Sequence, residues 1–266
     1  MGHVFAAQSP RYPGLVALKI LHPESTELEV KRFQAEAKAV ARLEHPNIVR
    51  VFEQRQSPEG HHYMAMELVD GESIDARVLR EGPMDPQRAA ELGRVLASAL
   101  TCAHEEGILH RDLKPHNVLI DGAGHVRLTD FGLAKVEGGE ALTRPGQVLG
   151  TPAYMSPEQA LAERARIDAR TDVYGLGATL YHVLTGRLPF TGKGVTQVLT
   201  KIVSTPPKPL REVRPEIPES LERVVLRCMS KESEKRYQSA ADLERALASF
   251  LSGGGLWSRL FGFFRR

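Results

Sequence analysis

The octapeptide His110–Asn117 (HRDLKPHN) constrains the fold of this chain more than any other stretch. It holds Asp112, Lys114 and Asn117 close together, and Asp130-Phe131-Gly132 follows thirteen residues after Asn117. Between the two motifs lie two β-rich stretches, 118–120 and 126–128, on either side of a turn. The two ends of a hairpin lie side by side, so we expect the loops that contain Asp112 and Asp130 to lie next to each other.

The octapeptide resembles the catalytic loop of protein kinases, H-R-D-L-x-x-x-N, and Asp130-Phe131-Gly132 resembles the D-F-G motif of that family. The resemblance implies phosphoryl transfer from ATP. Asp112 would take the proton of the acceptor hydroxyl, and Lys114 would reach the transferring phosphate. Asn117 and Asp130 would hold Mg²⁺, for which Mn²⁺ is the alternative.

Composition limits the alternatives to this reading. The 266 residues are 42% hydrophobic and 26% charged, which is typical of one large globular domain or two small ones. The net charge is +2, and no run of Lys or Arg exceeds two residues, so the sequence indicates no nucleic-acid site. Cys102 and Cys228 lie in apolar helical patterns, which favours buried thiols and a cytoplasmic location.

The start of the chain predicts two strands, 3–8 and 15–21, and the second contains Lys19 among apolar residues. An edge-strand lysine that reaches water is the alternative for Lys19 taken alone. However, Val16-Ala17-Leu18-Lys19 resembles the V-A-I-K strand of kinases, whose lysine binds the α- and β-phosphates and pairs with a glutamate on the next helix. Residues 28–43 have helical periodicity, and Glu36 on their apolar face is the predicted partner.

The expected strand at 61–70 would lead into the hinge between two lobes, near residues 67–71. The resemblance implies that Met66 is the gatekeeper and that the backbone of Glu67 and Val69 binds the adenine edge. Taken singly, apolar residues of this kind are more typical of plain core. The remaining residues that the resemblance places around the nucleotide are Gly2, Val4, Ala17 and Leu119.

The rest of the chain predicts helices at 86–106, 172–181, 221–229 and 240–251. Ser156-Pro157-Glu158 resembles the A-P-E motif that closes a kinase activation segment, with serine in place of alanine. The resemblance implies that Asp172 fastens the backbone of the catalytic loop and that Arg236 pairs with Glu158. A small-molecule kinase of similar fold is disfavoured by the long activation segment.

These features together resemble a eukaryotic-like, bacterial-type Ser/Thr protein kinase. The implied fold is α+β and bilobal, with a kinase domain at 1–251 that divides into an antiparallel-sheet N-lobe at 1–67 and a mainly helical C-lobe at 71–251. Residues 252–266 are expected to be a glycine linker and a short amphipathic basic and aromatic tail. Ser/Thr specificity, and therefore protein substrates with such hydroxyls, is inferred from Lys114-Pro115 and Thr151 by resemblance.

The glycine-rich loop departs from the family pattern, because Gly2 matches only its last glycine and the first strand is missing. We therefore expect codons upstream of Met1 to encode a short strand and Gly-x-Gly. The alternative is a pseudokinase, an ATP-binding scaffold without phosphoryl transfer. Retention of the whole polar set favours the enzyme; the set comprises Lys19, Glu36, Asp112, Lys114, Asn117 and Asp130.

Regulation and partners are also implied. Arg111 can bind a phosphate on the activation segment, and Thr143 is the expected autophosphorylation site, modified in trans within a kinase dimer; a plain loop threonine is the alternative. His116 stands where kinases that select arginine near the target often carry an acid, so no strong basic preference is expected. At helical spacing, residues 256–266 place their aromatic and leucine residues on one arc, which predicts peripheral contact with the inner face of a membrane or docking onto the large lobe.

Overall fold

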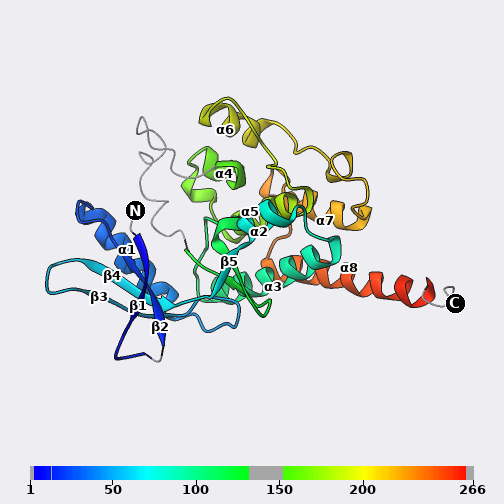
Figure 1. Ribbon diagram of the computed structural model, residues 1–266. Coiled ribbons are helices and arrows are strands. Elements are labelled where there is room, and N and C mark those ends of the chain that lie inside the picture. The colour runs from blue at the N-terminus through cyan, green and yellow to red at the C-terminus, as the bar shows by residue number, and fades with distance from the viewer. Residues whose placement is uncertain (1–2, 13, 132–151, 262–266) are drawn as a thin grey trace.

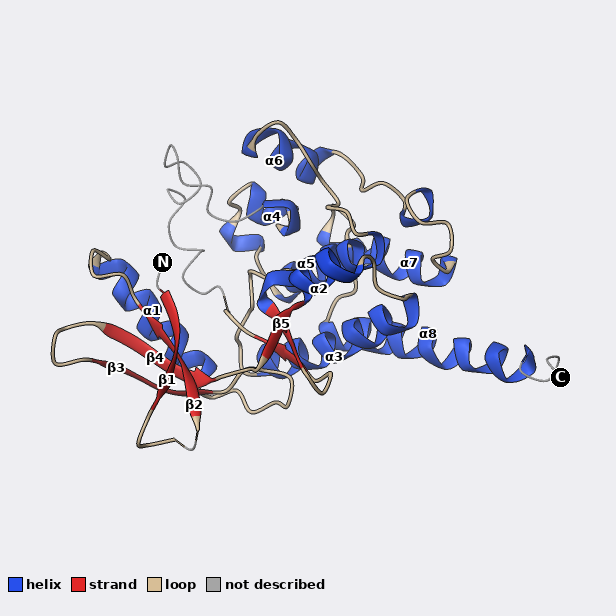
Figure 2. Ribbon diagram, in the orientation of Figure 1, coloured by secondary structure: helices blue, strands red, loops and turns tan. Residues whose placement is uncertain are grey.

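The computed structural model describes residues 3–12, 14–131 and 152–261, with residues 254–261 described as helical backbone only. A sheet carrying one helix lies on one side of the molecule and a mostly helical body on the other (Figure 1). The same division appears when the chain is coloured by secondary structure (Figure 2). The predicted α+β bilobal fold is confirmed.

The N-lobe sheet has four antiparallel strands in the order β1-β2-β4-β3. Its ladder places Ala17 opposite Met66 and Lys19 opposite Met64, so the predicted lysine strand lies in the middle of the sheet. Within the described residues β1 pairs on one side only, with β2, and is an edge strand. The strands are β1 (His3–Gln8), β2 (Leu15–Ile20), β3 (Val51–Gln56) and β4 (His62–Glu67).

Helix α1 (Glu27–Val40) is the single helix of this lobe among the described residues. It starts with a capping box, in which the Thr26 hydroxyl accepts from the Glu29 amide and the Glu29 carboxylate accepts from the Thr26 amide. Phe33, Glu36 and Val40 are buried on the face that the sequence predicted. The helix is therefore fixed in rotation with Glu36 turned toward the sheet.

The C-lobe begins with a three-stranded sheet in the order β5-β6-β7, which supports the catalytic loop. These strands are β5 (Gly71–Ser73), β6 (Val118–Asp121) and β7 (Val126–Leu128). The longer helices are α2 (Ile74–Glu81), α3 (Pro86–Glu105), α5 (Ala169–Thr185), α6 (Val195–Ser204), α7 (Glu219–Cys228) and α8 (Ala240–Phe261), and α4 (Pro157–Ala160) is a single turn.

Helix α5 forms the centre of the C-lobe. Fourteen of its seventeen residues are buried, and α3, α7 and α8 pack around it. A helix that is apolar on nearly all sides is stable only inside a lobe, where every face finds a partner. Because the start of α5 lies beside the catalytic loop, the most buried element of the lobe positions the candidate site.

Most predicted elements are confirmed, but the end of the last helix was predicted wrongly. The glycines at 253–255 were expected to break it, whereas α8 continues through them to Phe261. Burial of Leu243 and Leu247 nucleates the helix, and extending it across a glycine costs only about 1 kcal/mol per residue. The C-terminal part of α8 extends past the rest of the lobe (Figure 1).

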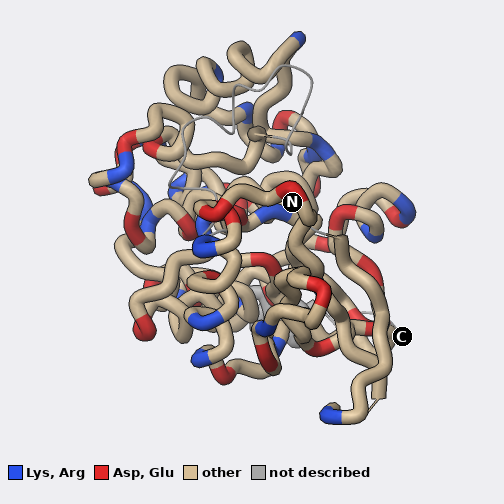
Figure 3. The backbone as a smooth tube through the Cα atoms, turned by 90° about the vertical axis from the view of Figure 1, so that its left-hand side faces the viewer, with Lys and Arg blue, Asp and Glu red and all other residues tan. Residues whose placement is uncertain are grey.

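Lys and Arg are interspersed with Asp and Glu along the chain, with no broad area of one sign in this view (Figure 3). None of the helices in the described part of the chain has both the length and the apolar character needed to cross a bilayer.

Candidate active site

The catalytic loop is held by one buried carboxylate at the start of α5. Asp172, which is 1% exposed, accepts hydrogen bonds from the His110 amide at 2.8 Å and the Arg111 amide at 2.7 Å. His104 in α3 donates from Nε2 to the same carboxylate at 2.8 Å. Arg111 has a φ of 61°, a left-handed conformation that is unfavourable for a residue with a side chain. The bonds to Asp172 stabilise that conformation, so the predicted fastening role is confirmed.

His110 joins the catalytic loop to the second acidic motif. Burial lowers the pKa of His110, so the ring is neutral. Its Nε2 donates to the Thr129 carbonyl at 3.0 Å, and its Nδ1 accepts from the Asp112 amide at 3.2 Å. The ring also packs on Phe131, with centroids 4.6 Å apart. The two acidic loops therefore meet, as the hairpin between them predicted.

Asp112 lies within a compact set of polar groups. Lys114 Nζ is 3.0 Å from Asp112 Oδ2, and Asn117 Nδ2 donates to that oxygen at 3.1 Å and to the Asp112 carbonyl at 2.9 Å. The amide nitrogen of Asn117 is thus occupied, which leaves its Oδ1 available to a cation. The structure brings together Asp112 and Lys114, predicted as catalytic residues, and Asn117, predicted as a metal ligand.

Lys19 connects the sheet, α1 and the second acidic motif. Its Nζ lies 2.8 Å from Asp130 Oδ1 and 3.6 Å from Glu36 Oε1, which confirms the predicted Lys19–Glu36 pair. Burial raises the pKa of Glu36 to about 7, with the charge of Asp130 adding to the rise and Lys19 opposing it. Burial would lower the pKa of Lys19, but Asp130 and Glu36 outweigh it and raise that pKa. The site thus holds more carboxylate than one lysine neutralises, as a site for a further cation should.

The predicted adenine residues occupy different environments. Met66 is buried and lines a small cavity together with Glu36, Met64 and Phe131. The Glu67 amide donates to the Arg50 carbonyl, so only the carbonyl of Glu67 can face an adenine. The other predicted contacts are Ala17, which is buried, Val69 and Leu119, which are half-buried, Val4, which is 55% exposed, and Gly2, which lies outside the described residues.

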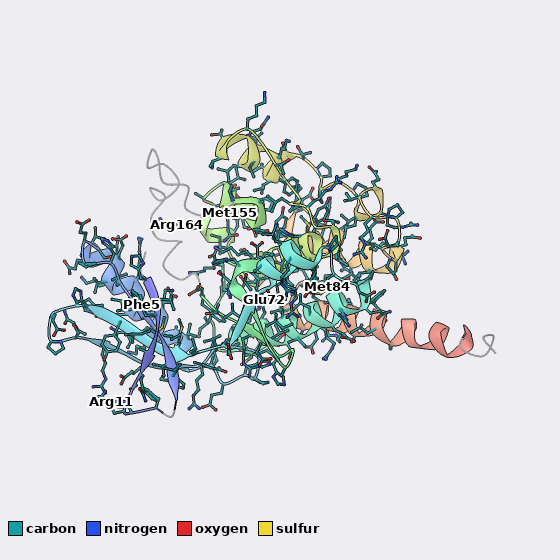
Figure 4. The ribbon with its side chains drawn as sticks, in the orientation of Figure 1. Phe5, Arg11, Glu72, Met84, Met155 and Arg164 are labelled. Atoms are coloured by element: carbon teal, nitrogen blue, oxygen red, sulfur yellow. The ribbon has the colours of Figure 1, made fainter. Side chains whose placement is uncertain are left out.

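After the second acidic motif, the described residues resume at Pro152. Arg236 is fully buried and donates to both Glu158 oxygens at 2.8 Å, and Thr171 donates to the same carboxylate at 2.8 Å. This confirms the predicted Glu158–Arg236 pair. Figure 4 shows Met155 and Arg164 on the helical lobe and Phe5 on the sheet. Thr143 and Thr151 lie outside the described residues.

Two contacts of the site were not predicted. His104 reaches Asp172 from α3, and Gln159 Nε2 donates to the Arg111 carbonyl at 2.7 Å. Ser156 and Gln159 form a capping box, a pattern that marks a helix start in the sequence. That pattern locates Gln159 on α4 but does not reveal its contact with the catalytic loop.

Comparison with known families agrees with this geometry. The model of the protein kinase domain matches residues 1–247. Among solved structures, Rad53 residues 1–466 in complex with AMP-PNP superimposes with a TM-score of 0.74 at 28% identity, covering 91% of this chain and 60% of that one.

Curated relatives from bacteria are more similar in sequence. The serine/threonine-protein kinase pkn3 of Myxococcus xanthus is 40% identical over 90% of this chain, PrkC of Bacillus subtilis 34% over 92%, and PknB of Mycobacterium tuberculosis 38% over 95%. The chain covers 46%, 38% and 41% of these relatives, which is less than half of each. The motifs, the fold and these relatives lead to one conclusion: the chain belongs to the protein kinase family, among the bacterial-type serine/threonine kinases.

Proposed function

We propose that this chain transfers the γ-phosphate of ATP to serine and threonine hydroxyls of protein substrates. The observation that carries the proposal is the joined polar set, in which Asp112 contacts Lys114 and Asn117 while Asp130 contacts Lys19. A pseudokinase does not transfer phosphate and would not need these side chains to be held in contact. Here all of them are present, and each contacts another member of its own group.

Each residue of the set has a role that its position supports. The Asp112 carboxylate would accept the proton of the substrate hydroxyl, and Lys114 beside it would stabilise charge on the transferring phosphate. Lys19, held by Glu36, would bind the phosphates from the sheet side. The adenine would lie against Ala17 and Leu119 near the hinge.

The donor set also fits a divalent cation, for which we propose Mg²⁺. Asn117 Oδ1 and the Asp130 carboxylate are hard oxygen ligands. Within the described residues no group of three or more His, Cys, Asp or Glu could hold a metal. Such a sparse protein set suits Mg²⁺, which takes its other ligands from water and phosphates. When bound, Mg²⁺ neutralises charge on the phosphate oxygens during transfer.

The test is phosphate transfer from radiolabelled ATP to the protein itself and to a generic acceptor, with Mg²⁺ or Mn²⁺ present. Asp112→Asn and Asp130→Ala should each abolish labelling. Nucleotide binding, measured by calorimetry, should survive better in Asp112→Asn, because Asp112 does not hold the nucleotide. Undiminished labelling in Asp112→Asn would remove Asp112 from its assigned role.

Autophosphorylation at Thr143, in trans between two copies, is a second part of the proposal. Arg111 supports it, because its buried Nε has no hydrogen-bond partner in the described part of the chain. A buried guanidinium nitrogen without an acceptor suits a phosphate. Phosphopeptide mapping should find Thr143 modified, and consistent occupancy of other sites with Thr143 unmodified would contradict this.

The tail supports a third part, peripheral contact with a membrane through residues 256–266. No Asp or Glu follows Glu244, whereas the tail contains Arg259, Arg265 and Arg266 among its aromatic residues. The projection of α8 away from the lobe favours contact with an anionic lipid surface over docking onto the kinase (Figure 1). Co-sedimentation with anionic vesicles should fall when residues 253–266 are deleted, and unchanged co-sedimentation would exclude this role. The cytoplasmic location remains a prediction.

A further inference from the structure

The connection between α6 and the short helix η5 (Leu210–Glu212) is rich in proline, with the sequence TPPKP at residues 205–209. A proline ring fixes φ at about −65°, and a residue that precedes proline is disfavoured from the helical region. Each of the five residues is under one or both constraints, which together favour the polyproline II conformation. Helix α6 ends at Ser204. The backbone is extended at Thr205 (φ −112°, ψ 126°) and at Pro209 (φ −51°, ψ 135°), as these constraints require.

The segment presents two of its edges to solvent and the third to the protein. A polyproline II helix has about three residues per turn, so residues three apart lie along the same edge. Thr205 and Lys208 lie along one edge, and both are exposed. Pro206 and Pro209 lie along the second edge, and both are also exposed. Pro207, on the third edge, is partly buried. The surface therefore displays two successive pairs of a residue and its following proline.

The backbone of this segment is available to another molecule. Among the described residues, the carbonyls of residues 205–208 accept no hydrogen bond and the Lys208 amide donates none. The end of the segment is anchored, because Leu210 is fully buried and the Arg211 amide donates to Glu222 Oε1 at 2.8 Å. The connection between α6 and α7 lies along the outer edge of the helical lobe, away from the N-lobe sheet (Figure 2). An anchored, extended segment with unused carbonyls loses little conformational freedom when it binds.

Two cationic side chains accompany the exposed prolines. Lys208 Nζ lies 3.7 Å from Glu212 Oε2, and both side chains are more than half exposed, so this ion pair separates readily. Arg211 is exposed, and its guanidinium forms no ion pair or hydrogen bond within the described part of the chain. A groove that fits this surface therefore needs aromatic side chains to pack on the proline rings and carboxylates to pair with the cations.

We propose that residues 205–211 bind a partner protein whose groove is lined by aromatic residues and bordered by acidic ones, in the mode by which SH3 domains bind proline-rich segments. The pairs Thr205-Pro206 and Lys208-Pro209 enter the groove, and Arg211 contacts its acidic border. The segment contains none of the residues assigned to phosphate transfer. The inference therefore goes beyond the proposed kinase activity and adds a surface through which the enzyme is brought to a partner.

The probe is an isolated SH3 domain that selects Pro-x-x-Pro-x-Arg, the spacing of Pro206, Pro209 and Arg211. Titration of the isotopically labelled domain with the full chain, followed by NMR, should shift resonances of its aromatic groove. Pro206→Ala and Pro209→Ala should each weaken binding by about fivefold or more, because each removes a ring from the groove. Arg211→Glu should weaken binding by about tenfold or more, because a negative charge then faces the acidic border.

Pro207→Ala is the matched control, since it removes the ring that faces the protein, and it should change binding by about twofold at most. Thermal unfolding and phosphate transfer should be the same in the four variants as in the wild-type protein, which separates binding from folding and from catalysis. An SH3 domain with alanine in place of its groove aromatics should not bind. Absence of groove shifts with the wild-type chain, or unchanged binding by folded Pro206→Ala and Arg211→Glu, would overturn the proposal.

Discussion

At the scale of single residues, Glu36 has the least ordinary environment in the site. It is 6% exposed, and its pKa rises from 4.5 to about 7 because burial disfavours its charge. Between these two values the folded protein keeps a proton that the unfolded chain has released. The free energy of unfolding therefore falls as the pH rises from about 4.5 to about 7, and this group contributes no further change above that range.

Glu36→Gln should remove that slope. Between pH 5 and pH 8, titration of Glu36 should lower the free energy of unfolding of the wild-type protein by on the order of 1–3 kcal/mol. The variant should not show this decrease. Urea unfolding at several pH values measures the difference. Glu44→Gln, which changes an exposed glutamate just beyond the same helix, should keep the wild-type slope. Parallel curves for the wild-type protein and Glu36→Gln would show that Glu36 titrates normally.

At the scale of elements, the start of α5 determines the shape of the catalytic loop. Asp172→Asn replaces one carboxylate oxygen with an amide nitrogen, which cannot accept from the amides of His110 and Arg111 as both oxygens now do. The loop should relax from its left-handed conformation at Arg111. Because displacements near 1 Å at a reacting group can cost about 100-fold in rate, phosphate transfer should fall by that order.

Asp168→Asn is the control for this prediction. Asp168 caps the same helix and pairs with Arg170 rather than with the catalytic loop, and asparagine is an equally good cap. This variant should keep most of its activity. If both variants are folded by circular dichroism and have comparable activity, Asp172 does not determine the conformation of the catalytic loop.

At the scale of the whole molecule, one buried ion pair joins distant parts of the C-lobe. Arg236 lies between α7 and α8, and Glu158 lies in α4, so the pair links segments 78 residues apart. Arg236→Met should destabilise the protein by about 3–5 kcal/mol, because it leaves the Glu158 charge buried without a partner. Adding Glu158→Leu should restore part of that loss. Chemical unfolding of the two variants tests this, and a double variant less stable than Arg236→Met would contradict it.

Motifs predicted the active site better than periodicity predicted the helices. Lys19, Glu36, Asp112 and Asp130 were predicted because the family fixes their spacing within short windows. Helix α2 was missed because it has only eight residues and exposes Leu79, which obscures its apolar face. The Val, Thr and Ile residues of α6 are typical of strands, and packing against α4 and η3 overrides that preference.

Contacts between elements could not be predicted at all. Gln159 on α4 contacts the carbonyl of Arg111 in the catalytic loop, which is 48 residues away in the sequence. His104 on α3 contacts Asp172 at the start of α5, which is 68 residues away. No local pattern encodes such distances. They depend on how α2, α4 and α3 pack around α5, which is decided by the fold as a whole.

The edge strand β1 has a consequence for the behaviour of the protein in concentrated solution. Its sequence, HVFAAQ, contains no Lys, Arg, Asp, Glu or Pro, and Val4 and Phe5 are 55% and 52% exposed. Such an edge is a template for pairing with another chain. Light scattering on a protein of these 266 residues alone should therefore show association that grows with protein concentration and that Phe5→Lys suppresses. Leu79→Lys removes a more exposed apolar side chain from helix α2 and should suppress association much less. The reason is that colloidal stability would then depend on the unpaired backbone N–H and C=O groups of β1 rather than on exposed apolar area.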